Sequence, residues 1–328
     1  MNRVYKILFA AFVVTCCAVN GSAQPKTVRG QEVSEAVAKI AELIGSNYVS
    51  EEAGRRIAAH LVREHSGGRF DSVKSWDEFA ALSTKVLQAF SNDGHLYVGH
   101  DPKAVKDLLQ TTNKKDAEAE SGFFHGEEAR ARNYGFDEIR VLKGNIGYVR
   151  LSQINVSEKS LPTMFAAFAF VANTRALVLD LRDNGGGGSE IGPVLESFFL
   201  PKNTALLEFK SRGGQTTVEK TVAWVTREKY DNPLYIVVNK KTASAAEAVA
   251  FALQARGRAV VVGQPSAGAA NMNTWYAVND KVYVSVSTGA PALPGTNKSW
   301  EGVGVRPDHV TAPGGELEFI VRKMGEGR

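Results

Sequence analysis

Ser244 is the residue whose setting best suits covalent chemistry. It follows a short β-branched run, Tyr235–Val238, and precedes a segment of helical composition, Ala245–Gln254. A hydroxyl at the first turn of a helix lies beside unpaired backbone N–H groups and the positive end of the helix dipole. An oxyanion formed by its attack on a carbonyl would be stabilised there. A plainer interpretation also fits, since Ser244 and Glu247 have the spacing of a capping box.

A candidate base for such a nucleophile, and a carboxylate in an unusual setting, occur far away in the chain. Of the six histidines, His95 is the one that lies between a turn glycine and an apolar, strand-like segment, which would fix its ring. Glu301 lies in Trp-Glu-Gly-Val-Gly, an unusual setting for a carboxylate. A serine nucleophile needs a base within hydrogen-bond reach, and the base needs an orienting partner. A structural histidine and a solvated turn glutamate are the alternatives.

The glycine run Gly185–Gly188 follows a strand-like segment, Ala176–Leu181, and precedes the apolar segment Ile191–Leu200. Glycines let the backbone turn tightly and bring N–H groups close to a ligand. The end of such a strand is where ligands bind in open α/β sheets. The run lacks the Lys-Ser/Thr of a phosphate-binding P-loop, so a phosphate site is not favoured. A mobile surface loop is the other interpretation.

The elements that must position these residues divide the chain into four parts. Residues 1–23 have a basic start, an apolar core and small residues at the end, as a cleavable signal peptide does. Residues 24–100 predict a helical domain that ends at the His95 strand. Residues 101–133 are charged and weakly patterned, so they are a linker or a loop covering the site. Residues 134–328 alternate strands and helices and predict an α/β catalytic domain. The expected helix caps are Ser34, Ser50 and Ser75.

The strand and helix patterns of the last part indicate βαβ units, whose strands run parallel. Leu161–Val171 and Ala245–Gln254 are the expected helices. The expected strands are Ile139–Leu142, Ile146–Leu151, Ala176–Leu181, Leu206–Phe209, Thr217–Trp224, Tyr235–Val238, Ala259–Val262, Thr274–Val278 and Val282–Ser287.

Composition and charge exclude several classes of function. The chain has 328 residues, 44% hydrophobic and 23% charged, as an ordinary globular protein does. Its net charge of +4, with scattered basic residues, predicts no nucleic-acid partner. No apolar window after residue 25 is long enough to span a membrane, so no stable span is expected after signal cleavage.

Both cysteines, Cys16 and Cys17, lie inside the expected signal peptide. A lipid anchor is not expected, because Val14 and Thr15 are not the small residues that such a cysteine follows. A short membrane anchor is the other alternative to a signal peptide. After cleavage no cysteine remains for a disulfide, a thiolate nucleophile or a metal site. We therefore expect a periplasmic or secreted protein with no metal and no cofactor.

Four motifs follow one another along the chain: Asp-Gly-His-Leu at His95, the glycines after Asp-Leu-Arg-Asp-Asn, Thr-Ala-Ser-Ala-Ala-Glu at Ser244, and Trp-Glu-Gly-Val-Gly-Val-Arg-Pro-Asp at Glu301. Together they resemble the S41 peptidase family, the tail-specific or C-terminal-processing serine peptidases. They are most similar to the branch that includes interphotoreceptor retinoid-binding protein and the tricorn protease core. The resemblance implies a crotonase-like (ClpP/crotonase) α/β core of βαβ units with a small N-terminal helical domain.

The resemblance also implies roles for single residues. Ser244 would be the nucleophile, His95 the general base and Glu301 the acid that orients the histidine. The oxyanion hole would be formed by backbone N–H groups of Gly186 or Gly187 and of Ala245.

Two departures from the family pattern refine these roles. Another branch uses a Ser/Lys dyad, but the corresponding segment here, Ser266–Asn271, has no lysine, and Lys281 lies further on. This favours Ser-His-Glu. The tricorn core has a serine where this chain has Gly94, so a fourth polar member of the site is not implied.

The expected function is hydrolysis of peptide bonds in peptides or unfolded proteins by a serine peptidase, through an acyl-enzyme intermediate. A non-catalytic binder of small apolar ligands on the same fold is the alternative. An acyl-CoA enzyme of the crotonase type fits less well, because the signal peptide directs the chain away from an intracellular cofactor. The sequence indicates no oligomeric state.

Overall fold

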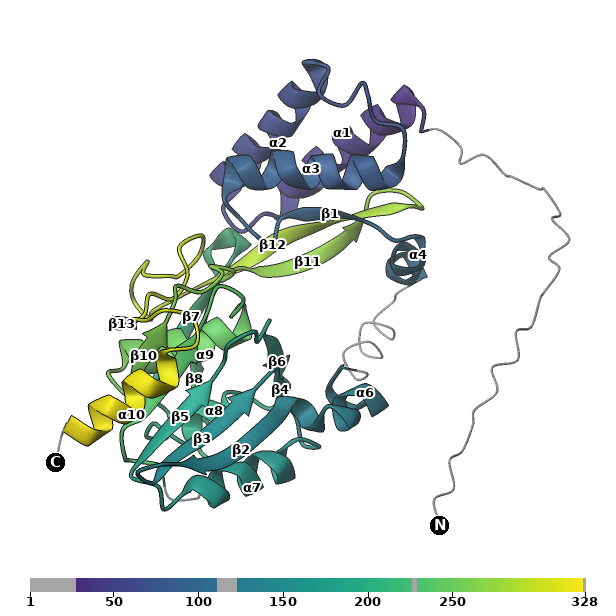
Figure 1. Cartoon of the computed structure of the whole chain (residues 1–328). Coiled ribbons are helices and arrows are strands. Elements are labelled where there is room, and N and C mark those ends of the chain that lie inside the picture. Colours follow the sequence, from purple (N-terminus) through teal and green to yellow (C-terminus); the bar gives the residue numbers. More distant parts are fainter. Residues whose placement is uncertain (1–27, 111–122, 226–228, 327–328) are drawn as a thin grey trace, which may run out of the picture.

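The computed structural model describes residues 28–110, 123–225 and 229–326 (Figure 1). The predicted signal peptide, residues 1–23, lies outside the described residues. Within those ranges, no helix combines the length and apolar character needed to cross a bilayer.

Three helices form the N-terminal region: α1 (Gly30–Asn47), α2 (Glu51–Ser66) and α3 (Trp76–Ser91). The predicted caps of α2 and α3 are confirmed. The Ser50 hydroxyl accepts a hydrogen bond from the Ala53 N–H at 3.3 Å, and Ser75 accepts one from the Glu78 N–H at 3.2 Å. Such caps satisfy N–H groups that the helix itself leaves unpaired.

The predicted cap of the first helix, Ser34, is wrong. The helix begins one turn earlier, at Gly30, where the Glu32 carboxylate accepts the N–H of Arg29 at 2.9 Å. The Ser34 hydroxyl donates back to the Gly30 carbonyl at 3.0 Å. A serine within a helix commonly makes this bond, so its presence does not mark the helix start.

A five-stranded antiparallel sheet lies beneath these helices (Figure 1). Its order is β1-β12-β7-β8, and β11 also pairs with β12. The predicted strand 217–224 is shorter in the structure and ends at Lys220. The strands are β1 (Tyr97–His100), β7 (Ala205–Ser211), β8 (Thr216–Lys220), β11 (Met272–Ala277) and β12 (Val282–Ala292).

The helices do not close a core of their own. Val282, Val284 and Val286 of β12 are fully buried in the same cluster as Ile40 and Leu87 of the helices. Three short helices have a narrow apolar stripe each, and a sheet face completes their burial. Because β12 comes late in the chain, the N-terminal region depends on residues near the C-terminus.

The second sheet has six strands in the order β13-β10-β9-β5-β3-β2, and every pair is parallel except β2 with β3. The predicted parallel pairing around Ala245–Ala255 (α9) is confirmed, with Tyr235 opposite Val260. The strands are β2 (Phe136–Leu142), β3 (Ile146–Leu151), β5 (Ala176–Asp180), β9 (Leu234–Val238), β10 (Ala259–Gly263) and β13 (His309–Val310).

Helices cover both faces of this parallel sheet. α7 (Leu161–Val171) and α9 pack on one face with alternate strand residues such as Leu179 and Ile236. α10 (Glu316–Glu326) covers the other face, where Ile320 is fully buried against the intervening strand residues. Strands buried on both faces are continuous apolar runs, as the sequence pattern indicated. The predicted α/β class is therefore confirmed.

Smaller elements join these layers. A two-stranded parallel ladder, β4 (Ile154–Val156) with β6 (Gly187–Ser189), lies where the glycine run leaves the sheet. The segment predicted as a linker or loop, 101–133, contains two short helices, and its residues 111–122 lie outside the described ranges. The remaining elements are α4 (Pro102–Gln110), α6 (Glu127–Ala131), α8 (Val194–Ser197) and the 3₁₀ turns η1 (Asn133–Gly135) and η2 (Arg212–Gly214).

Candidate active site

Ser244 lies at the N-cap of α9, on a sharp turn after β9. Its backbone has φ 53° and ψ −124°, a conformation that residues other than glycine rarely adopt. Two hydrogen bonds hold the turn against the segment that follows β5. The Thr242 hydroxyl donates to the Leu181 carbonyl at 2.8 Å, and the Ala243 N–H donates to the Asn184 carbonyl at 2.9 Å. Neighbouring structure therefore imposes the strained backbone of Ser244.

Glu247 anchors the start of this helix. Its buried carboxylate accepts the Ser244 N–H at 2.9 Å, so the capping role predicted for it is confirmed. The carboxylate also accepts the Ser266 hydroxyl at 2.5 Å and the N–H groups of Gly268 and Ala269 at 2.7 and 2.9 Å. Four donors satisfy the buried charge. Glu247 thus fixes both the nucleophile turn and the loop after β10.

Gly186 lies against the nucleophile. Its φ is +105°, and a Cβ atom there would come within 2.7 Å of the Ser244 Cβ and 2.9 Å of the Ala243 carbonyl oxygen. Only glycine permits that approach. The Gly186 N–H donates to the Asn184 side-chain oxygen at 2.9 Å. Of the predicted oxyanion donors, the Gly186 N–H is therefore already hydrogen-bonded to another residue of the protein.

The other two predicted donors, Gly187 and Ala245, have different surroundings. Ala245 is the first residue of α9, so the helix offers its N–H no partner. In the β4–β6 ladder, Ile154 N–H donates to Gly186 O at 2.8 Å and Glu190 N–H donates to Val156 O at 2.9 Å. Parallel ladders use alternate residues, so the Gly187 N–H points away from β4.

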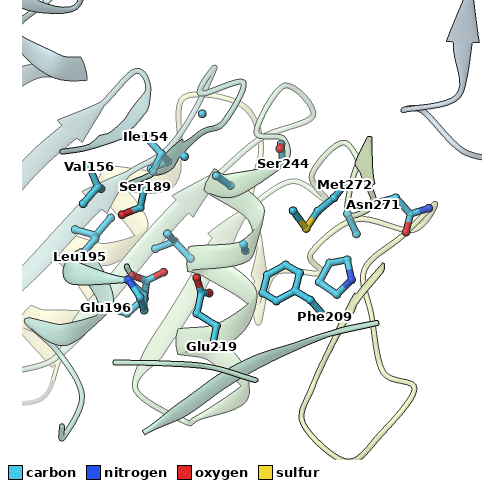
Figure 2. Close-up of a pocket in the computed structure, with 18 of the residues that line it drawn as sticks. Ile154, Val156, Ser189, Leu195, Glu196, Phe209, Glu219, Ser244, Asn271 and Met272 are labelled. Atoms are coloured by element: carbon cyan, nitrogen blue, oxygen red, sulfur yellow. The ribbon is translucent and has the colours of Figure 1, made fainter. Parts of the chain in front are cut away.

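Ser244 and His95 both line one cavity of about 400 Å³, although 149 positions separate them in the sequence. Figure 2 shows Ser244 at this cavity together with residues from β4, α8, β7 and β8. Gly187 and Ala245 also line the cavity. A pocket lined by a serine, a histidine and backbone N–H donors has the groups that an acyl-transfer site requires.

His95 is held through its backbone. Its N–H donates to the Asp93 carboxylate at 2.9 Å, and its carbonyl accepts the Ser285 hydroxyl at 2.6 Å. Its Nδ1 atom is buried and has no hydrogen-bond partner among the described residues. Burial lowers the pKa of His95, and the nearby charges of Asp93 and Glu247 oppose that shift only in part. A neutral imidazole can accept a proton.

Glu301 is hydrogen-bonded to the loop that contributes Ala270 and Asn271 to the cavity lining. One carboxylate oxygen, Oε2, accepts the N–H groups of Ala270 and Asn271 at 2.7 and 2.8 Å. The other oxygen, Oε1, is buried, and no hydrogen-bond donor for it lies in the described ranges. Burial raises the pKa of Glu301 to about 7, and the negative charge of Asp93 adds to the shift.

The structure brings the three predicted residues from three distant segments into one region. Ser244 and His95 share the cavity, and Glu301 is bonded to Ala270 and Asn271, which line it. Within the described residues, no hydrogen bond joins Ser244 to His95 or His95 to Glu301. Unliganded sites often have looser distances than the reacting complex.

Sequence reasoning did not single out Asp93. It is 2% exposed, and besides the His95 N–H it accepts the Tyr48 hydroxyl at 2.8 Å and the Asn271 side-chain amide at 3.2 Å. It therefore links α1, the histidine turn and the loop held by Glu301. Its place two residues before His95 in a tight turn was the available signal.

Lys281, the candidate for a Ser/Lys dyad, lies elsewhere. Its ammonium group is bonded to Asp280 at 2.6 Å in an exposed turn. No lysine of the described ranges lines the cavity that contains Ser244. The geometry thus agrees with the sequence argument against a Ser/Lys dyad.

Comparison with known proteins identifies the family. Residues 145–311, just over half of the chain, match the model of peptidase family S41. The chain belongs to peptidase family S41. Residues 27–123 of this S41 chain also match the N-terminal domain of peptidase S41 in eukaryotic IRBP. The family predicted from the sequence is confirmed.

The S41 chain is 33% identical over 166 residues to the chloroplastic carboxyl-terminal-processing peptidase 2 of Arabidopsis thaliana. The matched region makes up 50% of this chain and 31% of that relative. The chain spans less than half the length of the curated relatives that it matches. The roles of Ser244, His95 and Glu301 stay predictions.

Two solved structures share the fold of the S41 chain. The photosystem II D1 C-terminal processing protease has a TM-score of 0.53 at 16% identity. The aligned region includes 89% of this chain and 97% of the protease chain. The tricorn protease has a TM-score of 0.57 at 11% identity. The aligned region includes 91% of this chain and 37% of the tricorn chain. At these identities the likeness supports the fold class alone.

Proposed function

We propose that this S41 chain is a serine peptidase that hydrolyses peptide bonds through an acyl-enzyme on Ser244. The observation that carries the proposal is the position of Ser244. It lies at the start of α9 and lines a cavity of about 400 Å³ that His95, Gly187 and Ala245 also line. Backbone donors in such a place stabilise the tetrahedral oxyanion.

In the acylation step, the Ser244 Oγ attacks the scissile carbonyl carbon while its proton passes to His95 Nε2. The carbonyl oxygen becomes an oxyanion that accepts the N–H groups of Gly187 and Ala245. When the C–N bond breaks, His95 gives the proton to the leaving amine. In deacylation, water attacks the ester carbon, His95 accepts the water proton, and that proton returns to Oγ as the ester bond breaks.

Glu301 would orient His95. The His95 Nδ1 atom can donate and the Glu301 Oε1 atom can accept, and both are buried without a partner among the described residues. A contact between them, direct or through one water molecule, would satisfy both atoms. It would fix the tautomer that leaves Nε2 free to accept a proton from Ser244, and the carboxylate would stabilise the imidazolium formed.

The site of action would be the periplasm or the exterior of the cell. Residues 1–23 carry the pattern of a cleavable signal peptide. Peptides or unfolded proteins would be the substrates. Mass spectrometry of the purified mature protein tests this part, because a chain beginning at Gln24 is expected, and an intact Met1 in the exported protein would contradict it.

The test of the catalytic role is Ser244→Ala. Labelling by a fluorophosphonate probe should disappear, and the turnover number for a cleaved peptide should fall at least about 10⁴-fold, since the nucleophile is lost. The unfolding midpoint should change little, because a capping hydroxyl contributes only about 1 kcal/mol. Ser211→Ala, on an exposed strand end, is the control and should keep full labelling. Undiminished cleavage by Ser244→Ala contradicts the proposal.

The apolar part of the cavity favours one second candidate, a binder of small apolar ligands. Leu195, Phe209 and Val249 are among its lining residues. A protein of that kind would bind an environment-sensitive apolar dye in this cavity and would not react with the fluorophosphonate probe. Labelling at Ser244 decides for the enzyme.

A further inference from the structure

The cavity beside Ser244 contains two acidic residues that the proposed mechanism does not use. Glu196 comes from α8 and is only 7% exposed, and Glu219 comes from β8 and is partly buried. Figure 2 shows both side chains approaching the same region of the pocket, among the apolar side chains of Leu195 and Phe209. The two glutamates belong to different elements, so the fold alone brings them together.

Within the described residues, the Glu196 carboxylate has a hydrogen bond from its own backbone N–H, and neither carboxylate has a partner on another residue. Among the described residues, none forms an ion pair with Glu196 or Glu219, and none donates a side-chain or backbone hydrogen bond from another residue to either carboxylate. A glutamate as buried as Glu196 is almost always paired. An unpaired buried carboxylate lowers the stability of a fold, so packing does not account for this pair. A ligand that carries the missing positive charge does.

The pKa values of the two carboxyl groups agree with a site that binds a cation. Burial raises the pKa of Glu196 to about 8, and the charge of Glu219 adds to that shift. Burial also raises the pKa of Glu219. At neutral pH Glu196 therefore retains its proton. A bound cation would favour the ionised forms and release that proton.

We propose that this cavity is a specificity pocket for a lysine or arginine side chain of the substrate, whose charge Glu196 and Glu219 bind. The proposal rests on the proposed peptidase function. The side chain belongs to the residue on the acyl side of the scissile bond, because the cavity is lined by Ser244, Ala245 and Gly187, the groups that would hold that carbonyl. Its methylene stem would lie along the apolar wall, and its charged end would reach the two acids.

The test compares two fluorogenic peptides that differ only in that residue, lysine in one and norleucine in the other. Norleucine has a similar chain without the charge. The wild-type protein should cleave the lysine peptide with a kcat/KM at least about 100-fold higher, because a buried charge pair discriminates strongly. Glu196→Gln and Glu219→Gln should each lower the lysine-to-norleucine ratio of kcat/KM at least about tenfold. Glu52→Gln, exposed on α2, is the control and should keep the ratio.

A binding measurement separates this inference from the proposed function. The Ser244→Ala protein should bind the lysine peptide at least about tenfold more tightly than the norleucine peptide in calorimetry. Equal affinities, or cleavage that favours norleucine, overturn the specificity pocket and leave the peptidase in place. Absence of fluorophosphonate labelling and of any cleavage overturns the peptidase, whereas selective binding of the lysine peptide would still support a cation site.

Discussion

At the scale of single residues, Glu247 and Glu301 have different proposed tasks near Ser244 because their hydrogen-bond donors differ. Glu247 accepts four hydrogen bonds, three of them from backbone N–H groups. These bonds fix the Ser244 turn and the loop after β10. Glu301 receives two, both on Oε2. Its free Oε1 makes Glu301, and not Glu247, the carboxylate available to a histidine. Glu247 follows Ser244 by three positions, so sequence spacing alone would have favoured Glu247 as that carboxylate.

The proposed roles predict how the rate depends on pH. His95 must be neutral to accept a proton, and Glu301 must be ionised to orient it, so both must be deprotonated. Burial lowers the pKa of His95 from 6.5, whereas the pKa of Glu301 is raised to about 7. The higher of the two controls the rise, so kcat/KM should increase with pH through about 7 and decrease as the pH falls below it.

The pH profile of Glu301→Gln tests this assignment. The variant should be at least about 100-fold slower, and its remaining rise should shift to lower pH, where only His95 titrates. Glu318→Gln, which changes an exposed residue of α10, should reproduce the wild-type profile. If the rise near pH 7 persists in Glu301→Gln, another group controls it.

At the scale of elements, the site depends on how closely the glycine run approaches the start of α9. Gly186→Ala would place a methyl group 2.7 Å from the Ser244 Cβ at a φ of +105°. We expect a loss of about 2–4 kcal/mol of unfolding free energy and at least about a 100-fold loss of kcat, since the nucleophile and the oxyanion donors would shift. Urea unfolding and peptide kinetics measure the two effects.

Gly185→Ala is the matched control in the same run. A Cβ at Gly185 meets no atom within 4 Å, and its φ is not positive. Its unfolding free energy should change by less than about 1 kcal/mol. Equal losses in the two variants would mean that flexibility of the run, and not its contact with Ser244, sets the cost.

The sequence predicted local elements well and long-range pairings poorly. The apolar runs on both sides of α9, the helix between them and the caps Ser50 and Ser75 follow from short-range rules. The pairing of β1 with β12 does not, because nothing local to Tyr97 indicates Ser285 as its partner. The same limit applied to the site. Glu196 lies in an apolar run and Glu219 in an alternating strand, and only tertiary structure brings them into one cavity.

At the scale of the whole molecule, we expect the helical region and the sheets to unfold as one cooperative structure, because they share packing through β12. β12 buries its valines under the helices and also pairs with β7, which lines the cavity through Phe209. Loss of packing in the helices should therefore destabilise the site as well. Domains that share a core in this way unfold together.

Leu87→Ala tests this coupling. Leu87 is fully buried under the sheet, so the variant should lose about 2–5 kcal/mol of unfolding free energy. Urea curves from far-UV circular dichroism and from tryptophan fluorescence should remain coincident and shift together. Val62→Ala, at a side chain 43% exposed on α2, should shift both curves very little. Two separate transitions, of which Leu87→Ala moves only one, would show that the helices unfold independently.

The β1–β12 pairing also sets the order in which the site is completed during synthesis. Tyr97 leaves the ribosome 188 positions before its partner Ser285, which at about 5–20 residues per second is a delay of about 10–40 s. During that interval the turn that carries His95 lacks the strand whose Ser285 hydroxyl binds the His95 carbonyl. Ser244 emerges before that strand as well. A nascent chain thus carries Ser244 and His95 for some time before it can assemble them with Glu301, which follows β12 in the chain, and this delay would protect the cell that makes it.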